Sequence, residues 1–104
     1  MSQMTTLSSL QAMLPGSALM NSTELAAQQI NISRVGTDSR QIDSGELFVA
    51  LAGERFDAHD FLSDVAKAGA AAALISAQDK CPKDLPAICV PDTRVGLGDL
   101  AAAW

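Results

Sequence analysis

Charged and polar side chains gather between Thr37 and Phe61, on both sides of the apolar run "LFVAL". Two arginines, Arg40 and Arg55, lie there among several carboxylates and the only histidine of the chain, His59. Such residues could transfer protons or bind an anion. A single histidine excludes a multi-histidine zinc site, and the sequence contains neither G-x-S-x-G nor the phosphate-binding pattern G-x-x-x-x-G-K-[ST]. The segment therefore favours a binding site over a catalytic one.

The surrounding elements are predicted to place the loop after the apolar run at one edge of a sheet. Residues 47–51 form a continuous apolar run, typical of a strand buried on both faces. A helix is predicted from Asp60, its expected N-cap, to about Ala68, with Gly69 after its end. A second apolar strand over 71–75 completes a βαβ unit with parallel strands. Because ligands of such sheets bind beyond the carboxyl ends of the strands, the loop after residue 51 is a candidate polar site.

Each candidate residue in this loop also has a structural interpretation. Gly53 would let the backbone approach a ligand, and Arg55 suits a phosphate. Phe56 could lie against a flat base or fold back onto the core. Asp57 could simply form a turn, and His59 is more often a structural hydrogen-bonding group than a catalyst.

The polar residues before the strand also allow two interpretations. Asp38, Ser39 and Arg40 could face a ligand, or they could close a turn. In the second case Asp38 or Ser39 bonds backbone amides, and Arg40 pairs with Glu46 or Asp43.

The remaining sequence predicts a small α/β domain of two or three layers, with a mixed, partly parallel sheet and flanking helices. The further predicted elements are a helix over residues 7–14, strands over 30–35 and 87–90, a turn at 43–45, and a last helix capped by Asp92. Residues 17–28 show no clear pattern.

Composition narrows the class of ligand. The 104 residues carry a net charge of −5, and aromatic residues make up only 4% of the chain. A nucleic-acid-binding surface needs basic charge and usually exposed aromatic side chains, so this class is not expected. Cys81 and Cys89 fit no metal or redox spacing, and a disulfide between them is disfavoured. The first residues lack the basic region and continuous apolar core of a signal peptide, and no apolar run reaches membrane-spanning length. We therefore expect a cytoplasmic protein without membrane insertion.

An ordered series of motifs from Ile32 to Trp104 resembles the N-terminal domain of the Mur ligase family. The motifs are "TDSR", "GELFVAL", "GERFDAHDF", "AKAGAAAALI" and "VPDTRVGLGDLAAAW". Residues 1–31 match only as a helix followed by a variable segment. No single tetrapeptide is specific, and the resemblance rests on the order and spacing of the series.

The resemblance implies a three-domain cytoplasmic ligase of peptidoglycan synthesis. In this family a central domain binds ATP and magnesium, and the peptide's terminal carboxylate becomes an acyl-phosphate that an amine attacks. The implied partners are a UDP-N-acetylmuramoyl-tripeptide and, on other domains, D-alanyl-D-alanine. The present chain would hold the UDP end of the substrate, without cofactor, metal site or activity of its own. The alternative within the family is the ligase that adds the third peptide residue.

The resemblance also implies which residues bind the substrate. Asp38, Ser39 and Arg40 would face the uridine diphosphate, and the loop after residue 51 would wrap the uracil and ribose. The predicted substrate-binding residues are Asp38, Ser39, Arg40, Gly53, Glu54, Arg55, Phe56, Asp57 and His59. Many relatives have glycine where this chain has Ala58, and because alanine disfavours a positive φ, we expect a right-handed or extended backbone at this position.

The last helical pattern has no stop signal, since Leu97, Leu100 and Ala101 keep helical spacing up to Trp104. We therefore expect residues 1–104 to be the N-terminal domain of a longer protein. The alternative is a short chain whose Trp104 docks on its own core. Two other classes of function stay open: a standalone module that binds a nucleotide sugar, and an interaction domain with an acidic surface.

Overall fold

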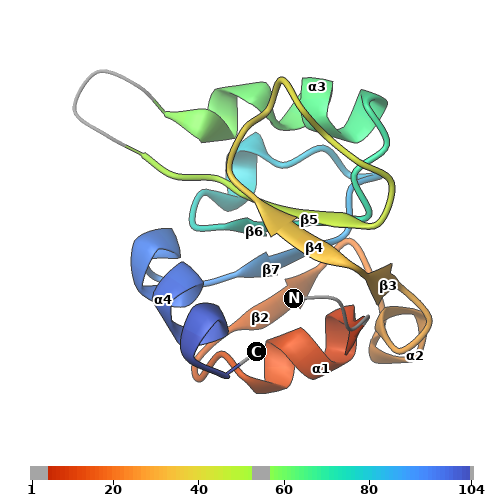
Figure 1. Cartoon of the computed structure of the whole chain (residues 1–104), viewed down its shortest axis with the longest axis vertical. Helices are drawn as coiled ribbons and strands as arrows, with labels where there is room; N and C mark the ends of the chain where they lie inside the picture. Colours follow the sequence, from red (N-terminus) through yellow and green to blue (C-terminus); the bar gives the residue numbers. More distant parts are fainter. Residues whose placement is uncertain (1–4, 53–56, 104) are drawn as a thin grey trace.

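The computed structural model describes residues 5–52 and 57–103, which form a sheet covered by helices on both faces (Figure 1). The five-stranded sheet has the order β2-β7-β6-β5-β4. Its strands are β2 (Ala18–Met20), β4 (Arg34–Gly36), β5 (Glu46–Val49), β6 (Ala72–Ile75) and β7 (Ala87–Cys89). Strands β4 to β7 are parallel to one another, and β2 runs antiparallel to β7 at one edge. Two short strands, β1 (Thr5–Thr6) and β3 (Asn31–Ile32), pair separately.

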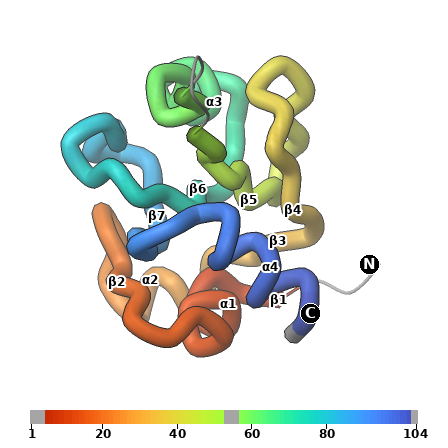
Figure 2. Tube along the Cα trace, turned by 90° about the vertical axis from the view of Figure 1, so that its left-hand side faces the viewer, coloured from red at the N-terminus to blue at the C-terminus, as the bar shows by residue number. Residues whose placement is uncertain are grey.

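The helices form the outer layers. They are α1 (Leu7–Ala12), α2 (Glu24–Ala27), α3 (Leu62–Lys67) and α4 (Thr93–Ala103), with 3₁₀ helices η1 (Ala58–Phe61) and η2 (Gln78–Lys80). In both views α3 lies on the opposite side of the sheet from α1 and α4 (Figure 1 and Figure 2). The domain therefore has three layers, with one core on each face of the sheet.

Alternation along the central strands separates the two cores. Every residue of β5 and β6 is buried. Leu47 and Val49 point into the core beneath α1 and α4, whereas Phe48 and Ala50 pack with Leu62 of α3 in the other core. Strands buried on both faces lose the polar alternation of a surface strand, which explains the uninterrupted apolar run.

Most of the sequence-based expectations for the elements are confirmed. The α/β class, the βαβ unit and the parallel pairing of β5 with β6 are present. Gly45 and Gly69 both have a positive φ, of 86° and 101°, as expected in a turn and after a helix. The predicted strand over 30–35 is divided at Ser33, since β3 pairs with β1 and β4 pairs with β5.

The expected N-cap of the helix after β5 is wrong. Asp57, not Asp60, caps this segment, because its side chain accepts a hydrogen bond from the backbone N–H of His59. The chain then makes the single 3₁₀ turn η1 before α3 begins at Leu62. Asp60 lies within that turn, so sequence pattern alone placed the cap three residues late.

Candidate functional site

The carboxyl ends of four parallel strands lie along one edge of the sheet. Residues 37–40 follow β4, residues 50–52 and 57–59 belong to the connection after β5, and Ser76 follows β6. Asp92 follows β7 and caps α4, since its carboxylate accepts from the backbone N–H of Arg94 at 2.8 Å. The predicted polar residues within the described part of the chain therefore lie on the edge where open α/β sheets bind ligands.

Asp38 and Arg40 form a compact turn at the end of β4. One oxygen of Asp38 accepts from the backbone N–H of Arg40 at 2.9 Å and from its Nε at 3.1 Å. These two hydrogen bonds, that of the side chain first, lower the pKa of the Asp38 carboxyl below its ordinary value. The Arg40 side chain is 87% exposed, so the ion pair is in water and costs little to exchange for another anion.

A pocket of about 520 Å³ adjoins this turn. Its lining consists of Thr37, Asp38, Ser39 and Arg40 from the end of β4, together with Phe61 from η1. It combines hydroxyl, carboxylate and guanidinium groups with one aromatic ring. Such a combination can hold a polar ligand that has a flat ring or an anionic group. Phe61 was not among the predicted site residues, because its apolar character indicated only the buried face of a helix.

His59 is held by hydrogen bonds on both sides of its ring. Its side chain is 2% exposed, and Nε2 accepts from the backbone N–H of Ser76 at 2.9 Å. Nδ1 lies 2.6 Å from an Asp57 oxygen, and since Nε2 is an acceptor, Nδ1 carries the proton and donates. The ring thereby joins the connections after β5 and β6, which gives His59 a positioning role.

Asp57 stays ionised over a wide range of pH. It accepts from the backbone and side chain of His59, and its second oxygen lies 3.1 Å from Nζ of Lys80. These interactions, the His59 backbone bond foremost, lower its pKa from the ordinary 3.8 to about 2. Lys80 also contacts Asp60 at 3.1 Å, and both carboxylates raise its pKa. The charged groups after β5 are therefore paired with one another and are not arranged for proton transfer.

The structure brings together only some of the predicted site residues. Asp38, Ser39 and Arg40 share one pocket, and Asp57 contacts His59 directly. Gly53, Glu54, Arg55 and Phe56 lie outside the described residues.

The hypothesis that Arg40 pairs with Glu46 or Asp43 is wrong. Arg34 makes both contacts: its Nε lies 3.1 Å from Glu46, and its Nη1 binds Asp43. The reason is strand register, because Arg34 on β4 lies directly opposite Glu46 on β5. Arg40, beyond the end of β4, turns back to Asp38 instead.

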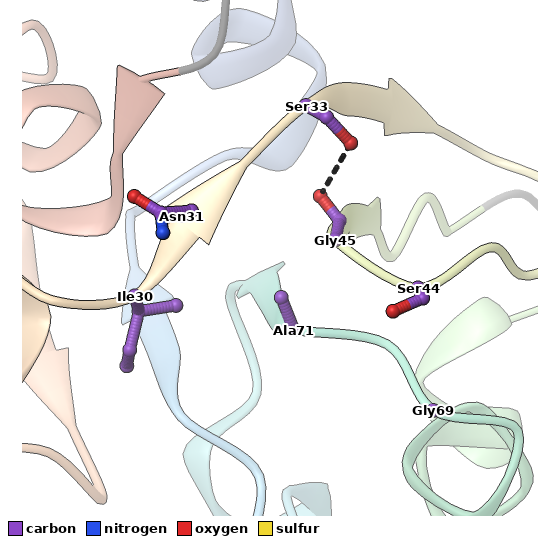
Figure 3. Close-up of a pocket in the computed structure, with 7 residues that line it drawn as sticks. All are labelled: Ile30, Asn31, Ser33, Ser44, Gly45, Gly69 and Ala71. Carbon is purple, nitrogen blue, oxygen red and sulfur yellow. Dashed lines mark hydrogen bonds between the residues drawn. The ribbon is translucent and has the colours of Figure 1, made fainter.

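A second pocket, of about 420 Å³, lies at the opposite edge of the sheet. It is formed where β5 and β6 begin, and its lining includes Asn31, Ser33, Ser44, Gly45 and Ala71 (Figure 3). Its polar groups are amides and hydroxyls without a charged side chain. None of the predicted site residues that the structure describes lines this pocket.

Within residues 5–52 and 57–103, no group of three or more His, Cys, Asp or Glu side chains is arranged to hold a metal ion. Both cysteines are free. None of the helices in this part of the chain is long and apolar enough to cross a bilayer.

Comparison with known proteins gives consistent matches. Residues 31–104 match the family model described as "Mur ligase family, catalytic domain". The UDP-N-acetylmuramoyl-tripeptide–D-alanyl-D-alanine ligase of Escherichia coli K12 is 52% identical over 76% of this chain and 17% of its own length. The UDP-N-acetylmuramoyl-L-alanyl-D-glutamate–2,6-diaminopimelate ligase of Geobacter sulfurreducens is 38% identical over 64% of this chain and 13% of its own length.

Among solved structures, a crystal structure of MurF from Acinetobacter baumannii superposes with a TM-score of 0.79. It is 35% identical in sequence, and the match covers 97% of this chain and 21% of that one. The fold is therefore shared over nearly the whole of the present chain. This chain spans about a fifth or less of the length of the relatives that it matches.

Proposed function

The chain belongs to the Mur ligase family, and from that premise we propose that it holds the UDP end of a muramoyl-peptide substrate. The proposed enzyme is MurF, the ligase that joins D-alanyl-D-alanine to UDP-N-acetylmuramoyl-tripeptide. The observation that carries the proposal is the placing of Asp38, Ser39 and Arg40 around one pocket at the carboxyl edge of the sheet. The identity to the E. coli ligase favours this member of the family.

The chemistry of the pocket suits a uridine diphosphate. Arg40 has an exposed guanidinium that can turn from Asp38 to a phosphate and donate two parallel hydrogen bonds. Asp38 and Ser39 can accept or donate to ribose and uracil groups. The Phe61 ring supplies an apolar wall. Because the whole chain carries a net charge of −5, these local groups, and not the overall field, must attract the anion.

In this proposal the chain positions the substrate and makes no bond. The 104 residues contain no G-x-x-x-x-G-K-[ST] sequence, so we assign ATP and magnesium to parts of the ligase that this chain does not span. Bound there, they would activate the peptide carboxylate for attack by the amine. The matched family model is described as a catalytic domain, whereas our proposal gives this part a binding role. A cytoplasmic location belongs to the same proposal.

A ligase that adds the third peptide residue is the alternative within the family, favoured by the similarity to the diaminopimelate ligase. That ligase would bind the UDP moiety of a shorter muramoyl peptide in the same way. A standalone nucleotide-sugar module would bind the UDP moiety but would have no ligase activity. Binding of the UDP moiety does not distinguish the two ligases and the standalone module from one another. Amide-bond formation by the complete protein with D-alanyl-D-alanine does distinguish them.

The test uses Arg40→Ala in the complete ligase. We expect the KM for the UDP substrate to rise roughly tenfold with kcat nearly unchanged. The reason is that a contact far from the reacting atoms stabilises the bound substrate and the transition state equally. Lys83→Ala is the matched control, since it removes an exposed positive charge before β7, at the opposite edge of the sheet. An equal loss of kcat and kcat/KM would contradict the binding role. ATP hydrolysis by the present chain alone would contradict the assignment of the ATP site.

A further inference from the structure

A buried carboxyl that the proposed site does not use lies beside it. Glu46, the first residue of β5, is 0% exposed. Its Oε1 forms an ion pair with Nε of Arg34 at 3.1 Å and accepts a hydrogen bond from the backbone N–H of Asp43 at 3.4 Å. Its Oε2 is buried without a hydrogen-bond partner among the described residues. Burying a carboxylate oxygen without a hydrogen-bond partner costs free energy of folding, which suggests that this side chain has a specific role.

The unpaired oxygen lies directly against the backbone of β4. A Cβ atom added to Gly36 would come within 2.5 Å of Oε2 and 2.8 Å of Cδ. Gly36 does not have a positive φ, so glycine is needed there for space and not for its conformation. Because Thr37 comes next, the carboxyl packs on β4 at the point where the predicted site segment begins. A recess of about 310 Å³ runs along this contact and includes Thr37 and Asp38 in its lining.

The turn that precedes Glu46 is also hydrogen-bonded to the residue before β4. The carbonyl oxygen of Gly45 accepts from the backbone N–H of Ser33 at 2.9 Å and from its hydroxyl at 3.5 Å (Figure 3). Ser33 immediately precedes β4. Residues 45 and 46 therefore contact both ends of β4: the Gly45 carbonyl is hydrogen-bonded to Ser33 before its start, and the Glu46 carboxyl packs on Gly36 at its end.

We propose that Glu46 is a positioning residue that fixes where residues 37–40 leave β4. It does not touch the ligand: it acts through Arg34 and through its packing on Gly36. The conformational part of this inference stands on the free chain, and only its effect on binding rests on the proposed function.

Titration of Glu46 offers a way to observe this link. Burial raises the pKa of its carboxyl above the ordinary 4.5. The charged groups that face it are Arg34 from β4, Asp43 from the preceding turn, and Asp38 with its partner Arg40 from the segment after β4. Protonation of Glu46 removes its ion pair with Arg34, so β4 loses one of the side-chain interactions that hold it against β5.

The experiment follows backbone amide and side-chain carboxyl NMR signals of the labelled free chain from about pH 3 to pH 8. In the native sequence, the amides of residues 37–40 should shift with the midpoint of the Glu46 carboxyl, above 4.5. The pKa of Asp38 is lowered below 3.8, so its own effect falls in a separate, more acidic range. Glu46→Gln should abolish the shift above 4.5, and Asp43→Asn should retain it. The same midpoint in Glu46→Gln, or a Glu46 titration that leaves residues 37–40 unmoved, overturns the inference.

A steric variant tests the same link without changing the charge. Gly36→Ala should displace the Glu46 carboxyl and move the amides of residues 37–40 at neutral pH. This variant keeps the inference testable if Glu46→Gln folds poorly. Unchanged amides in a folded Gly36→Ala chain overturn the inference.

Binding gives a second readout, with UDP-N-acetylmuramoyl-tripeptide as the probe. Glu46→Gln should weaken its binding about threefold to tenfold, because a positioning residue acts at a distance. If the native chain binds and Glu46→Gln binds equally well with unmoved amides, the inference fails and the proposed function stands. If residues 37–40 follow Glu46 but the native chain does not bind, the inference stands and the proposed function fails.

Discussion

The Nε2 atom of His59 accepts a hydrogen bond from the backbone N–H of Ser76 at 2.9 Å, and this bond joins the connections that follow two neighbouring parallel strands. The other ring nitrogen donates to Asp57, which in turn caps η1. One buried side chain thus fixes the carboxyl edge of the sheet at β5 and β6. The proposed ligand groups of residues 37–40 lie on the same edge of the sheet, after the neighbouring strand β4.

Replacing His59 by alanine should destabilise the chain by about 3 kcal/mol, since it leaves the Ser76 N–H without its acceptor and opens a cavity. Urea unfolding at neutral pH measures this loss. Asp60→Ala, in the same turn but exposed, is the control and should change the free energy of unfolding little. Equal effects of the two substitutions would show that His59 does not support this edge.

Asp57 should make stability depend on acid. Its pKa is depressed from 3.8 to about 2 in the folded chain, so the folded state binds this proton less readily than the unfolded state. The stabilisation is complete above the unfolded pKa and is lost as the pH falls through 3.8 toward about 2. Asp57→Asn should reduce the slope of stability against pH in that window. Asp79→Asn, at an exposed position in η2, should retain the native slope; an unchanged slope in Asp57→Asn would contradict the assignment.

Two glycines with positive φ should differ in their tolerance of alanine. Gly69 has open space around it, so Gly69→Ala should cost only the backbone strain, about 1 kcal/mol. A Cβ at Gly45 would also lie 2.8 Å from the Ser33 hydroxyl, so Gly45→Ala should cost about 2 kcal/mol. Thermal or urea unfolding of both variants compares these costs. In a Ser33→Ala background the extra cost at Gly45 should disappear, and its persistence would rule out the steric explanation.

Sequence patterns predicted the elements whose residues are buried uniformly. Burial on both faces gives β5 and β6 their continuous apolar runs, and the positive φ after α3 favours glycine. Both signals can be recognised in a short stretch of sequence. The Asp92 cap of α4 was likewise predicted from its position before an apolar helical pattern.

Features that depend on tertiary register could not be predicted from the sequence. Arg34 was not identified as the partner of Glu46, because their pairing requires β4 to lie parallel to β5 with these residues opposite each other. Strand β2 also escaped prediction, since its edge position depends on pairing with β7 and on the Asn21 amide, which donates to the carbonyls of Pro82 and Leu85.

For the site, the sequence predicted Asp38, Ser39 and Arg40 as binding residues but not their place at the carboxyl edge of the sheet, and it did not find Phe61, which lines the same pocket. An aromatic residue at a helical spacing gives no sign that it will face a pocket instead of the core. The resemblance to a family supplied the ligand class, which neither the spacing nor the pocket determines.

The most direct test of the central claim is an NMR titration of this chain with UDP-N-acetylmuramoyl-tripeptide. We expect weak binding, at roughly millimolar ligand, with the largest amide shifts at residues 37–40 and around Phe61. UDP alone should move the same amides, D-alanyl-D-alanine should move none of them, and Arg40→Ala should remove most of the response. Unmoved amides at residues 37–40 with the tripeptide ligand at these concentrations would contradict the account.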